Sequence, residues 1–579
     1  MATEPNTITR ILRITAFGIL TGAAASLAAI VFVEIVAQLN NLLFISPRSR
    51  VLAGETPWLT LMTIVVPTAG GLVVGLLCRY IAEDRPHTPS DVIRSVQLLS
   101  GKLPMRSSAL TALASIVALG SGASVGQYGP LAHMGATLGS ATSRLFKAGR
   151  TMGTIGVGCG VAAAISTAFN APIAGIIFAH EVILRHYSLR AFAPITVAST
   201  MGFIVANVLF ERAPLFRIQS VSVDHALEFL AFVIIGITGA LVAVAFMRSI
   251  LFCNRLADNI PLPSYLKPMV AGAVVGVVAI WLPDILGIGK ETLRFAIIED
   301  AFSPAELTVT LIAKILATAL CIGFGFAGGV FMPAMLIGIL FGALGGAGME
   351  WVVADFRSDI AIYAICGMVA VTSPVIGAPL TSILIVFELT RNYDLTTAAM
   401  VSVVFSNVVA YRIFGRSLFD VQLSLRGFDL SLGRDKVVLD HRVVADYLTQ
   451  KFTRLAPTLT LSEAKAVLTQ AGNSEGYVVS TDGIYLGTVS LPQLLALEAQ
   501  GQSVDERVDS VAAPEQLVLT SDTSLWEAME NMGDFVGESI PVLRSTNDRH
   551  LAGVVFEASI VKGYMDVQHE IRRDEHGAG

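Results

Sequence analysis

The sequence predicts a mainly α-helical membrane protein that ends in a soluble α/β region. Hydrophobic residues make up 54% of the 579 residues and charged residues only 15%, whereas soluble proteins carry about 25% charged residues. Apolar runs follow one another as far as about residue 426, and the composition then becomes polar. We therefore predict a membrane domain over 1–426, a linker over 427–441, and a soluble domain over 442–579.

The first apolar run begins after Arg10 and Arg13 and reaches about Leu39. It is longer than the core of a signal peptide, which has about 7–15 residues, so it predicts an uncleaved helix. The basic flank predicts a cytoplasmic N-terminus. We expect a multi-pass protein of the cell (inner) membrane with both termini in the cytoplasm.

Glycine or proline interrupts many of the later apolar runs, and several are shorter than the roughly 20 residues of a straight span. Interrupted helices are tolerated in a membrane only where their free backbone groups face protein or a polar cavity. The pattern is typical of a channel or transporter with re-entrant half-helices.

Two motifs occur twice, in the same order. Gly126-Gln127-Tyr128-Gly129-Pro130 resembles Gly329-Val330-Phe331-Met332-Pro333, and Ala171-Pro172-Ile173 with Glu181 resembles Ala378-Pro379-Leu380 with Glu388. The offsets are 203 and 207 residues. Duplicated halves with broken helices indicate a binding site where the halves meet, near the middle of the membrane.

The soluble domain is also duplicated. A helix over 464–471 precedes strands over 476–480 and 486–489, and a helix over 525–532 precedes strands over 540–543 and 552–555. Two such β-α-β units, over about 442–500 and 507–566 and followed by a polar tail, resemble a pair of CBS domains.

Charge and cysteine content exclude several classes of protein. A net charge of −6 is small for this length and predicts no nucleic-acid partner. The five cysteines are far apart, without the spacing of a metal site, and are expected to be buried apolar side chains. We predict no catalytic residues, metal or cofactor, and no enzymatic activity.

The duplicated glycine-rich loops carry the chemistry. A permeating anion needs positive potential without tight binding, and helix N-termini supply it through free N–H groups and the helix dipole. Proline begins such helices without wasting an N–H group. We therefore expect backbone around the two loops to bind a small inorganic anion, at Gly126, Tyr128, Gly129, Gly329, Val330 and Phe331.

Four motifs in order resemble the CLC chloride channels and transporters. They are Gly-Ser-Gly-x-Ser-x-Gly-x-x-Gly-Pro (120–130), Ala-Phe-Asn-Ala-Pro-x-Ala-Gly (168–175), Gly-Gly-x-Phe-x-Pro (328–333), and Gly-Ala-Pro-Leu-Thr (377–381) with Phe387-Glu388-Leu389-Thr390. The resemblance covers most of 10–426. It implies the family fold of two inverted halves of tilted and broken helices, and a homodimer in which each subunit has its own anion pathway.

Two departures from the family concern protons. CLC exchangers carry a glutamate in Gly-x-Glu-Gly-Pro, which swings in the pathway, and a second glutamate as the inner proton relay. Tyr128 and Val182 stand at these positions. A phenol with a pKa near 10 does not cycle protons at pH 7, and valine carries none. Tyr128 becomes the gate position, and Glu181 is expected to be a structural partner of a group such as Arg185. We expect the neighbouring His180 to be a buried, satisfied histidine.

Two further departures concern anion contacts. The family tyrosine in Ser-x-Tyr-Asp-x-x-Leu, whose hydroxyl reaches the central anion, is replaced by Phe419. The family loop Gly-Ser-Gly-Ile-Pro corresponds to the stretch 86–92, where counting back from Pro89 puts Pro86 at the serine position. Beside it, His87 becomes a candidate anion contact, and Thr88 or Ser90 an ordinary helix cap. In the CBS pair, Gln493 and Ser559 stand where adenosine-binding members often have aspartate, which makes nucleotide binding doubtful.

These observations together predict a passive, proton-uncoupled channel or uniporter for chloride-like anions. Three alternatives stay open. They are a proton-coupled CLC exchanger with a non-standard proton route, a CBS-linked divalent-cation transporter, and a non-conducting membrane sensor. The cation transporter would need converging carboxylates in the membrane, and the motifs offer glycine amides instead.

Overall fold

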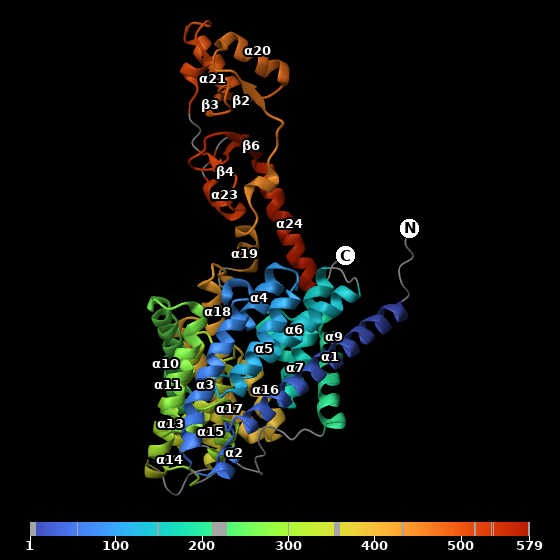
Figure 1. Cartoon of the computed structure of the whole chain (residues 1–579). Coiled ribbons are helices and arrows are strands. Elements are labelled where there is room, and N and C mark those ends of the chain that lie inside the picture. Colours follow the sequence, from blue (N-terminus) through green and yellow to red (C-terminus); the bar gives the residue numbers. More distant parts are fainter. Residues whose placement is uncertain are drawn as a thin grey trace. The chain divides into compact units, whose positions relative to one another are not determined.

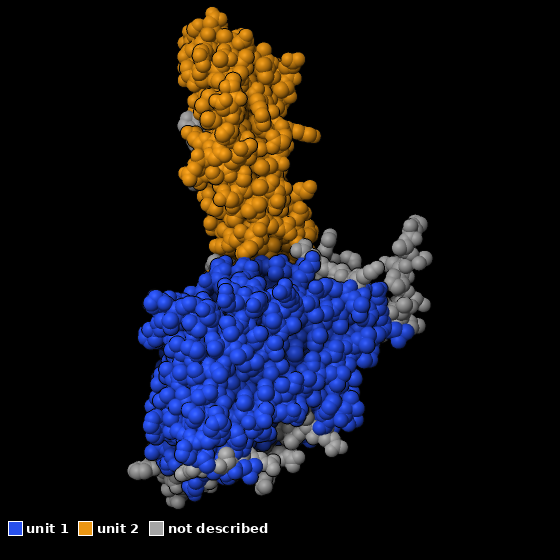
Figure 2. Space-filling view, in the orientation of Figure 1, with its two compact units in different colours: residues 1–428 blue, residues 429–579 orange. Residues whose placement is uncertain are grey.

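The computed structural model divides into two compact units, residues 1–428 and 429–579 (Figure 2). It describes residues 7–54, 56–146, 150–210, 228–298, 300–352, 359–430, 433–513, 517–533, 535 and 538–576. Each unit is described separately below.

The described residues of the first unit form helices (Figure 1). Those of the first half are α1 (Thr7–Leu42), α2 (Pro47–Ala53), α3 (Pro57–Cys78), α4 (Pro89–Leu98), α5 (Met105–Gly120), α6 (Tyr128–Leu145), α7 (Arg150–Phe169), α8 (Pro172–Phe178) and α9 (Leu189–Ile204). Those of the second half are α10 (Glu228–Asn259), α11 (Lys267–Val278), α12 (Lys290–Phe295), α13 (Pro304–Gly323), α14 (Phe331–Val352), α15 (Ile360–Ile376), α16 (Pro379–Thr390), α17 (Tyr393–Phe414) and α18 (Leu418–Ser424).

Eight helical segments of the described chain are long and apolar enough to cross a membrane, and five further apolar helices have only 10–17 residues. The prediction of a multi-pass membrane protein is therefore confirmed. The five shorter helices, among them α5, α15 and α16, also confirm the expectation of short, interrupted segments.

The two halves break their helices in the same way. After α7, Asn170 takes a left-handed conformation with φ of 60°, and Pro172 begins α8. After α15, Gly377 takes φ of 70°, and Pro379 begins α16. Proline fixes the first turn of the new helix, and a left-handed residue turns the chain out of the old one. The repeated Ala-Pro motif is therefore a repeated helix break.

Glycines bring neighbouring helices into close contact in both halves. A Cβ atom at Gly139 in α6 would lie 1.9 Å from the carbonyl oxygen of Gly156 in α7. A Cβ at Gly342 in α14 would lie 2.2 Å from the carbonyl oxygen of Tyr363 in α15. Side chains at these positions would force the helices apart, so the glycines set the close packing typical of membrane helices.

The second unit contains two three-stranded sheets of the same topology. Its elements are α19 (Arg434–Asp440), β1 (Thr453–Leu455), α20 (Leu461–Ala471), β2 (Glu475–Val479), β3 (Tyr485–Ser490), α21 (Leu491–Ala499), α22 (Val508–Val511), β4 (Leu519–Thr520), α23 (Leu525–Asn531), β5 (Ser539–Leu543), β6 (Leu551–Phe556) and α24 (Glu557–His576). In each sheet the first strand is parallel to the second, which is antiparallel to the third. The predicted duplication is confirmed.

Two sequence expectations need adjustment in this unit. The stretch predicted as a linker, 427–441, contains the helix α19, whose apolar Leu439 is fully buried among residues of the second copy. The tail after residue 566 continues the helix α24 as far as His576. Buried apolar residues such as Val567 and Ile571 explain why this polar-looking segment is helical and packed.

Candidate functional site

The two glycine-rich loops bond to each other through their backbones. The N–H group of Gly126 donates to the carbonyl of Gly329, and the N–H of Gly329 donates to the carbonyl of Gly126, each at 2.7 Å. The result is an isolated antiparallel bridge. Residues that are 203 apart in the sequence thus occupy equivalent places on either side of one junction, as the repeat predicted.

Two helices begin at this junction. Tyr128 is the first residue of α6 and Phe331 the first of α14, and proline is the third residue of both helices. A Cβ atom at Gly129 would lie 2.9 Å from the Cα atom of Gly329 and 3.6 Å from Cδ of Pro89, which begins α4. Three helix N-termini therefore meet, and their dipoles and free N–H groups favour an anion.

Tyr128 lies in an aromatic cluster at the junction and is only 1% exposed. Its ring stacks on Phe169, with centroids 3.8 Å apart, and contacts Phe331 edge-on at 5.5 Å. Phe331 also contacts Phe169 and Phe178, at 5.2 and 6.2 Å. Four aromatic rings from four helix ends thus fill the space beside the two loops.

The remaining candidates lie on elements next to the junction. Val330 directly precedes α14 and is 4% exposed, and Phe419 in α18 is 5% exposed. α18 packs against α4 and α15, and α4 packs against α6. His87 precedes the first turn of α4, where Thr88 is the N-cap residue, as the alternative interpretation of this loop had it.

Glu181 and Glu388 cap each other's helices. The carboxylate of Glu181 accepts from the backbone N–H groups of Leu380 and Thr381 in α16, at 2.9 and 2.8 Å. The carboxylate of Glu388 accepts from Ile173 and Ala174 in α8, at 2.9 and 2.7 Å. Each glutamate and each of its two N–H partners lies 207 residues from the equivalent residue of the other cap.

The partner that we expected for Glu181 was therefore wrong. Arg185 has φ of 61° and turns its guanidinium to Asp420 of α18 instead. Glu181 does have a structural role, but its partner is the N-terminus of the opposite half's helix, which sequence spacing alone does not reveal.

Val182 lies in a π-helical turn, Ala179–Leu184, that continues α8. Its side chain is 3% exposed, so the position of the family's relay glutamate is filled by a buried apolar group. His180 in the same turn is 1% exposed, and its Nδ1 atom lies 3.0 Å from the carbonyl oxygen of His186. Its Nε2 atom finds no hydrogen-bond partner among the described residues, so the expectation of a buried histidine is confirmed and that of a fully satisfied one is not.

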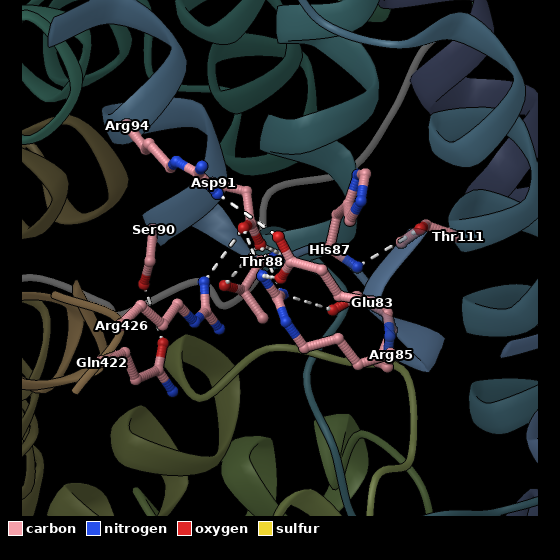
Figure 3. Close-up of polar contacts among 11 residues, drawn as sticks. Glu83, Arg85, His87, Thr88, Ser90, Asp91, Arg94, Thr111, Gln422 and Arg426 are labelled. Atoms are coloured by element: carbon pink, nitrogen blue, oxygen red, sulfur yellow. Dashed lines mark hydrogen bonds and ion pairs between the residues drawn. The ribbon is translucent and has the colours of Figure 1, made fainter. Parts of the chain in front are cut away.

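An ion cluster surrounds Asp91 at the end of the unit where α4 and α18 lie (Figure 3). Arg85 binds both oxygens of Asp91, at 2.9 and 2.8 Å, and Arg426 binds one at 3.0 Å. Glu83 pairs with Arg85 and Arg94. Burial opposes ionisation of Asp91, but Arg85 and Arg426 outweigh it and hold the pKa of that carboxyl well below its usual range.

A cavity of about 420 Å³ lies at the opposite end of the unit, beside α2. Its wall includes Arg50, the segment 286–292 and Gln127, the residue directly before Tyr128. The buried Lys314 stands behind this wall and donates to the carbonyls of Ile285 and Gly287, each at 3.0 Å. Because a buried ammonium group is poorly screened, it makes the potential at this wall more positive.

No group of three histidine, cysteine or acidic residues close enough to hold a metal ion occurs in the described part of the chain. The five cysteines are free, and all but Cys253 are buried. The site therefore offers backbone amides, aromatic rings and nearby positive charges. These groups attract an anion but do not bind it tightly.

Sequence reasoning missed three residues at the site. Phe169 lies inside the Ala-Phe-Asn-Ala-Pro motif, so its motif position was an available signal. Gln127 lies inside the repeated glycine loop and lines the cavity beside α2, so its place in the repeat was an available signal. His133 lies one helical turn after Gly129 in α6, and helical spacing would have placed it near the junction.

Comparison with known proteins gives one family. The sequence profile described as "Voltage gated chloride channel" matches residues 70–411, more than half of the chain. The "Putative chloride channel protein ClcB-like" of Ralstonia nicotianae is 28% identical over 406 residues, which cover 69% of this chain and 94% of that protein.

Two solved structures share the fold. One is described as a slow cyanobacterial Cl⁻/H⁺ antiporter, with a TM-score of 0.65, 24% identity, and coverage of 72% of this chain and 98% of the other. The second is described as a eukaryotic CLC transporter, with a TM-score of 0.64, 19% identity, and coverage of 96% and 99%. The second likeness extends over the C-terminal unit as well.

Proposed function

Because the chain belongs to the voltage gated chloride channel family, whose members are channels or transporters, we propose that it lets small, chloride-like anions cross the membrane passively, without moving protons. The observation that carries this proposal is the pair Tyr128 and Val182. They stand at the two positions where proton-coupled members of the family have glutamate. Tyr128 is stacked among aromatic rings and Val182 is a buried apolar side chain, so neither supplies a carboxylate.

The pathway in this proposal passes the junction of the two loops. An anion enters from the cavity beside α2, moves past Gln127, and meets the N–H groups at the starts of α6 and α14. Tyr128 closes this route as part of the aromatic cluster, because its ring occupies the space between the two helix starts. Opening requires the ring to leave Phe169.

The decisive experiment measures protons and anions together. The purified chain is reconstituted in liposomes under a chloride gradient, with the voltage clamped by potassium and valinomycin. We expect chloride to leave the liposomes while the internal pH stays constant. Reproducible uphill proton movement driven by chloride would overturn the uncoupled mechanism and leave anion transport intact.

A proton-coupled exchanger is the second candidate, and the structural neighbour described as an antiporter favours it. Such a mechanism would need a titratable group to replace Val182 near the same route. His180 is the nearest histidine in sequence, and its Nδ1 atom is already engaged by a backbone carbonyl. The liposome experiment separates the two candidates directly.

We also propose a homodimer. Ile173 and Leu380, on the helices α8 and α16, are 46% and 50% exposed, and the half-buried carboxylates of Glu181 and Glu388 lie on the same helix ends. Carboxylates on a lipid-facing surface are costly, so a second copy of this chain is the cover that such a face needs. Crosslinking between cysteines introduced at position 380 tests it.

The second unit, in this proposal, is a CBS pair that binds adenine nucleotides weakly or not at all. Gln493 stands where nucleotide-binding members of the family often have the aspartate that holds the ribose. Its carboxamide N–H donates to the carbonyl of Val511 at 3.0 Å, and its carboxamide oxygen accepts from the N–H of Ser490, which in turn caps the start of α21. It is therefore already committed to the fold. We place the whole protein in the cell (inner) membrane with both termini cytoplasmic, as the basic flank of α1 suggests.

A further inference from the structure

Two histidines, one buried and one half-buried, face each other beside the junction of the two loops. His133 in α6 is 1% exposed, and His87, just before α4, is half-buried. Their ring centroids lie 5.2 Å apart, at an interplanar angle of 66°. His87 Nδ1 and His133 Nε2 are both enclosed, and neither finds a hydrogen-bond partner within the described chain.

Unpartnered buried polar atoms are rare in proteins, because each costs the free energy of its lost hydration. Two of them on adjacent rings indicate that the site is completed by something that is not part of this chain. The occupant must be small, since the rings are in van der Waals contact with one another and His133 is fully enclosed.

The pair lies next to the proposed pathway. His133 is four residues after Gly129, which places it one turn further along α6 on the same face. Pro89, two residues after His87, packs against that first turn of α6. His87 is partly open to solvent and His133 is closed, and both lie within a few residues of the starts of α4 and α6, which meet at the junction.

The charges that face the pair come from the ion cluster (Figure 3). Asp91, Glu83, Arg85 and Arg426 act on His87, and Asp91 and Arg85 also act on His133. The cluster contains three arginines and two carboxylates. Its net charge is therefore positive, which attracts anions and opposes protonation of the rings when no anion is present.

We propose that His87 and His133 form a second anion-binding site, which takes up a proton from solvent together with a small inorganic anion such as chloride. The proton goes to one free ring nitrogen, and the resulting N–H group donates to the anion. No bond to the anion is covalent; the proton returns to solvent, and the anion leaves to solvent or to the pathway. This proposal rests on the proposed anion pathway and adds a pH dependence to it.

The sign of that dependence follows from the environment. Burial lowers the pKa of His87, and the positive charge of Arg85 and Arg426 works against the acids Asp91 and Glu83. The ring is therefore harder to protonate than a free imidazole, and the charge that it gains on acidification strengthens anion binding. Anion flux should rise as the pH falls, although no proton is carried across.

The experiment measures bromide and chloride flux from liposomes at pH 7.5, 6.5 and 5.5. We compare the unmodified chain with His133→Gln, His87→Gln, and His180→Gln as the matched control. His180 is equally buried in the same unit but lies outside this pair. We expect flux to rise several-fold on acidification in the unmodified chain and in His180→Gln. We expect no such rise in either variant of the pair.

A second measurement does not depend on folding of the variants. Calorimetry of bromide binding to the unmodified protein at pH 6.5, in two buffers of different ionisation enthalpy, counts the protons taken up with the anion. We expect a fractional uptake that disappears at pH 8.5. Flux that is independent of pH, or bromide binding without proton uptake, overturns the histidine site. Either result leaves passive anion flux standing, whereas uphill proton transport contradicts the uncoupled mechanism instead.

Discussion

The chain contains two internal duplications, whose copies meet at helix ends in the first unit and through packed sheets in the second. In the first unit, the halves meet through the backbone bridge of Gly126 and Gly329 and through the reciprocal carboxylate caps of Glu181 and Glu388. In the second unit, the copies share backbone hydrogen bonds, such as the one from the Tyr485 N–H to the Arg549 carbonyl, and their sheets pack through apolar side chains, including Tyr477, Leu543 and Val554.

The difference follows from the surroundings. Helix ends inside a membrane leave N–H and C=O groups that water cannot satisfy, so the opposite half has to supply their partners. The sheets of the second unit have already paired their backbone groups and gain stability by burying apolar surface. Only the first kind of junction leaves polar helix ends facing an interior space, and that space can hold an ion.

The backbone bridge should be the most sensitive point of the comparison. In Gly329→Ala, the new Cβ atom would lie 2.8 Å from the backbone nitrogen of Gly129, so the two loops must separate. We expect a loss of about 1–3 kcal/mol in stability and a large loss of anion flux. Gly348→Ala is the control, because a Cβ atom there meets nothing within 4 Å. Thermal unfolding in detergent compares the stability of the two variants. Equal melting temperatures would contradict the conclusion that the backbone bridge stabilises the protein.

The reciprocal caps should respond equally. Glu181→Gln and Glu388→Gln each replace a charged acceptor of two backbone N–H groups, and each should cost about 1–2 kcal/mol. Glu34→Gln in α1, whose carboxylate contacts only the exposed Gln38, is the control. A strong effect of Glu181→Gln on flux, without a comparable effect of Glu388→Gln, would show that Glu181 does more than cap α16.

Substitutions of Tyr128 at the start of α6 and of Phe331 at the start of α14 should affect anion flux to different extents. Tyr128→Ala removes the ring that stacks on Phe169 and should raise anion flux several-fold, because such a stack is worth about 0.5–1.5 kcal/mol. Tyr128→Phe keeps the stack and should raise flux far less. Phe331→Ala leaves that stack intact and should have an intermediate effect.

The same series tests the proton argument. Tyr128→Glu alone should not restore proton coupling, because Val182 still interrupts the inner route. Unchanged flux in Tyr128→Ala would show that Tyr128 does not gate the pathway. Full proton coupling in Tyr128→Glu would refute the argument that Tyr128 and Val182 together abolish proton transport.

The smallest effect is expected at the C-terminal duplication. Calorimetric titration of the full chain with ATP, ADP or AMP should give no measurable heat at micromolar concentrations, because Gln493 is held by Ser490 and Val511. Gln493→Asp, which restores the residue that the family often has, is the matched comparison. Micromolar affinity in the unmodified chain would contradict this prediction.

The sequence by itself determined the class, the spans and the repeats. Hydropathy and length are local properties, so the long apolar runs and the short, proline-interrupted helices could be predicted from composition. Motif repetition predicted that Gly126 and Gly329 hold equivalent places, since equal local sequences build equal local turns. The strand and helix order of the second unit followed from the same local periodicity.

Only the tertiary structure decided which groups face each other. The Glu181 carboxylate was expected to bind Arg185, four residues away, but it caps a helix that begins about 200 residues later. His87 and His133 are 46 positions apart, and no period in the sequence connects them. Partners of this kind depend on how helices from separate parts of the chain cross. The crossing is set by the packing of all the helices together, and a short stretch of sequence therefore does not contain it.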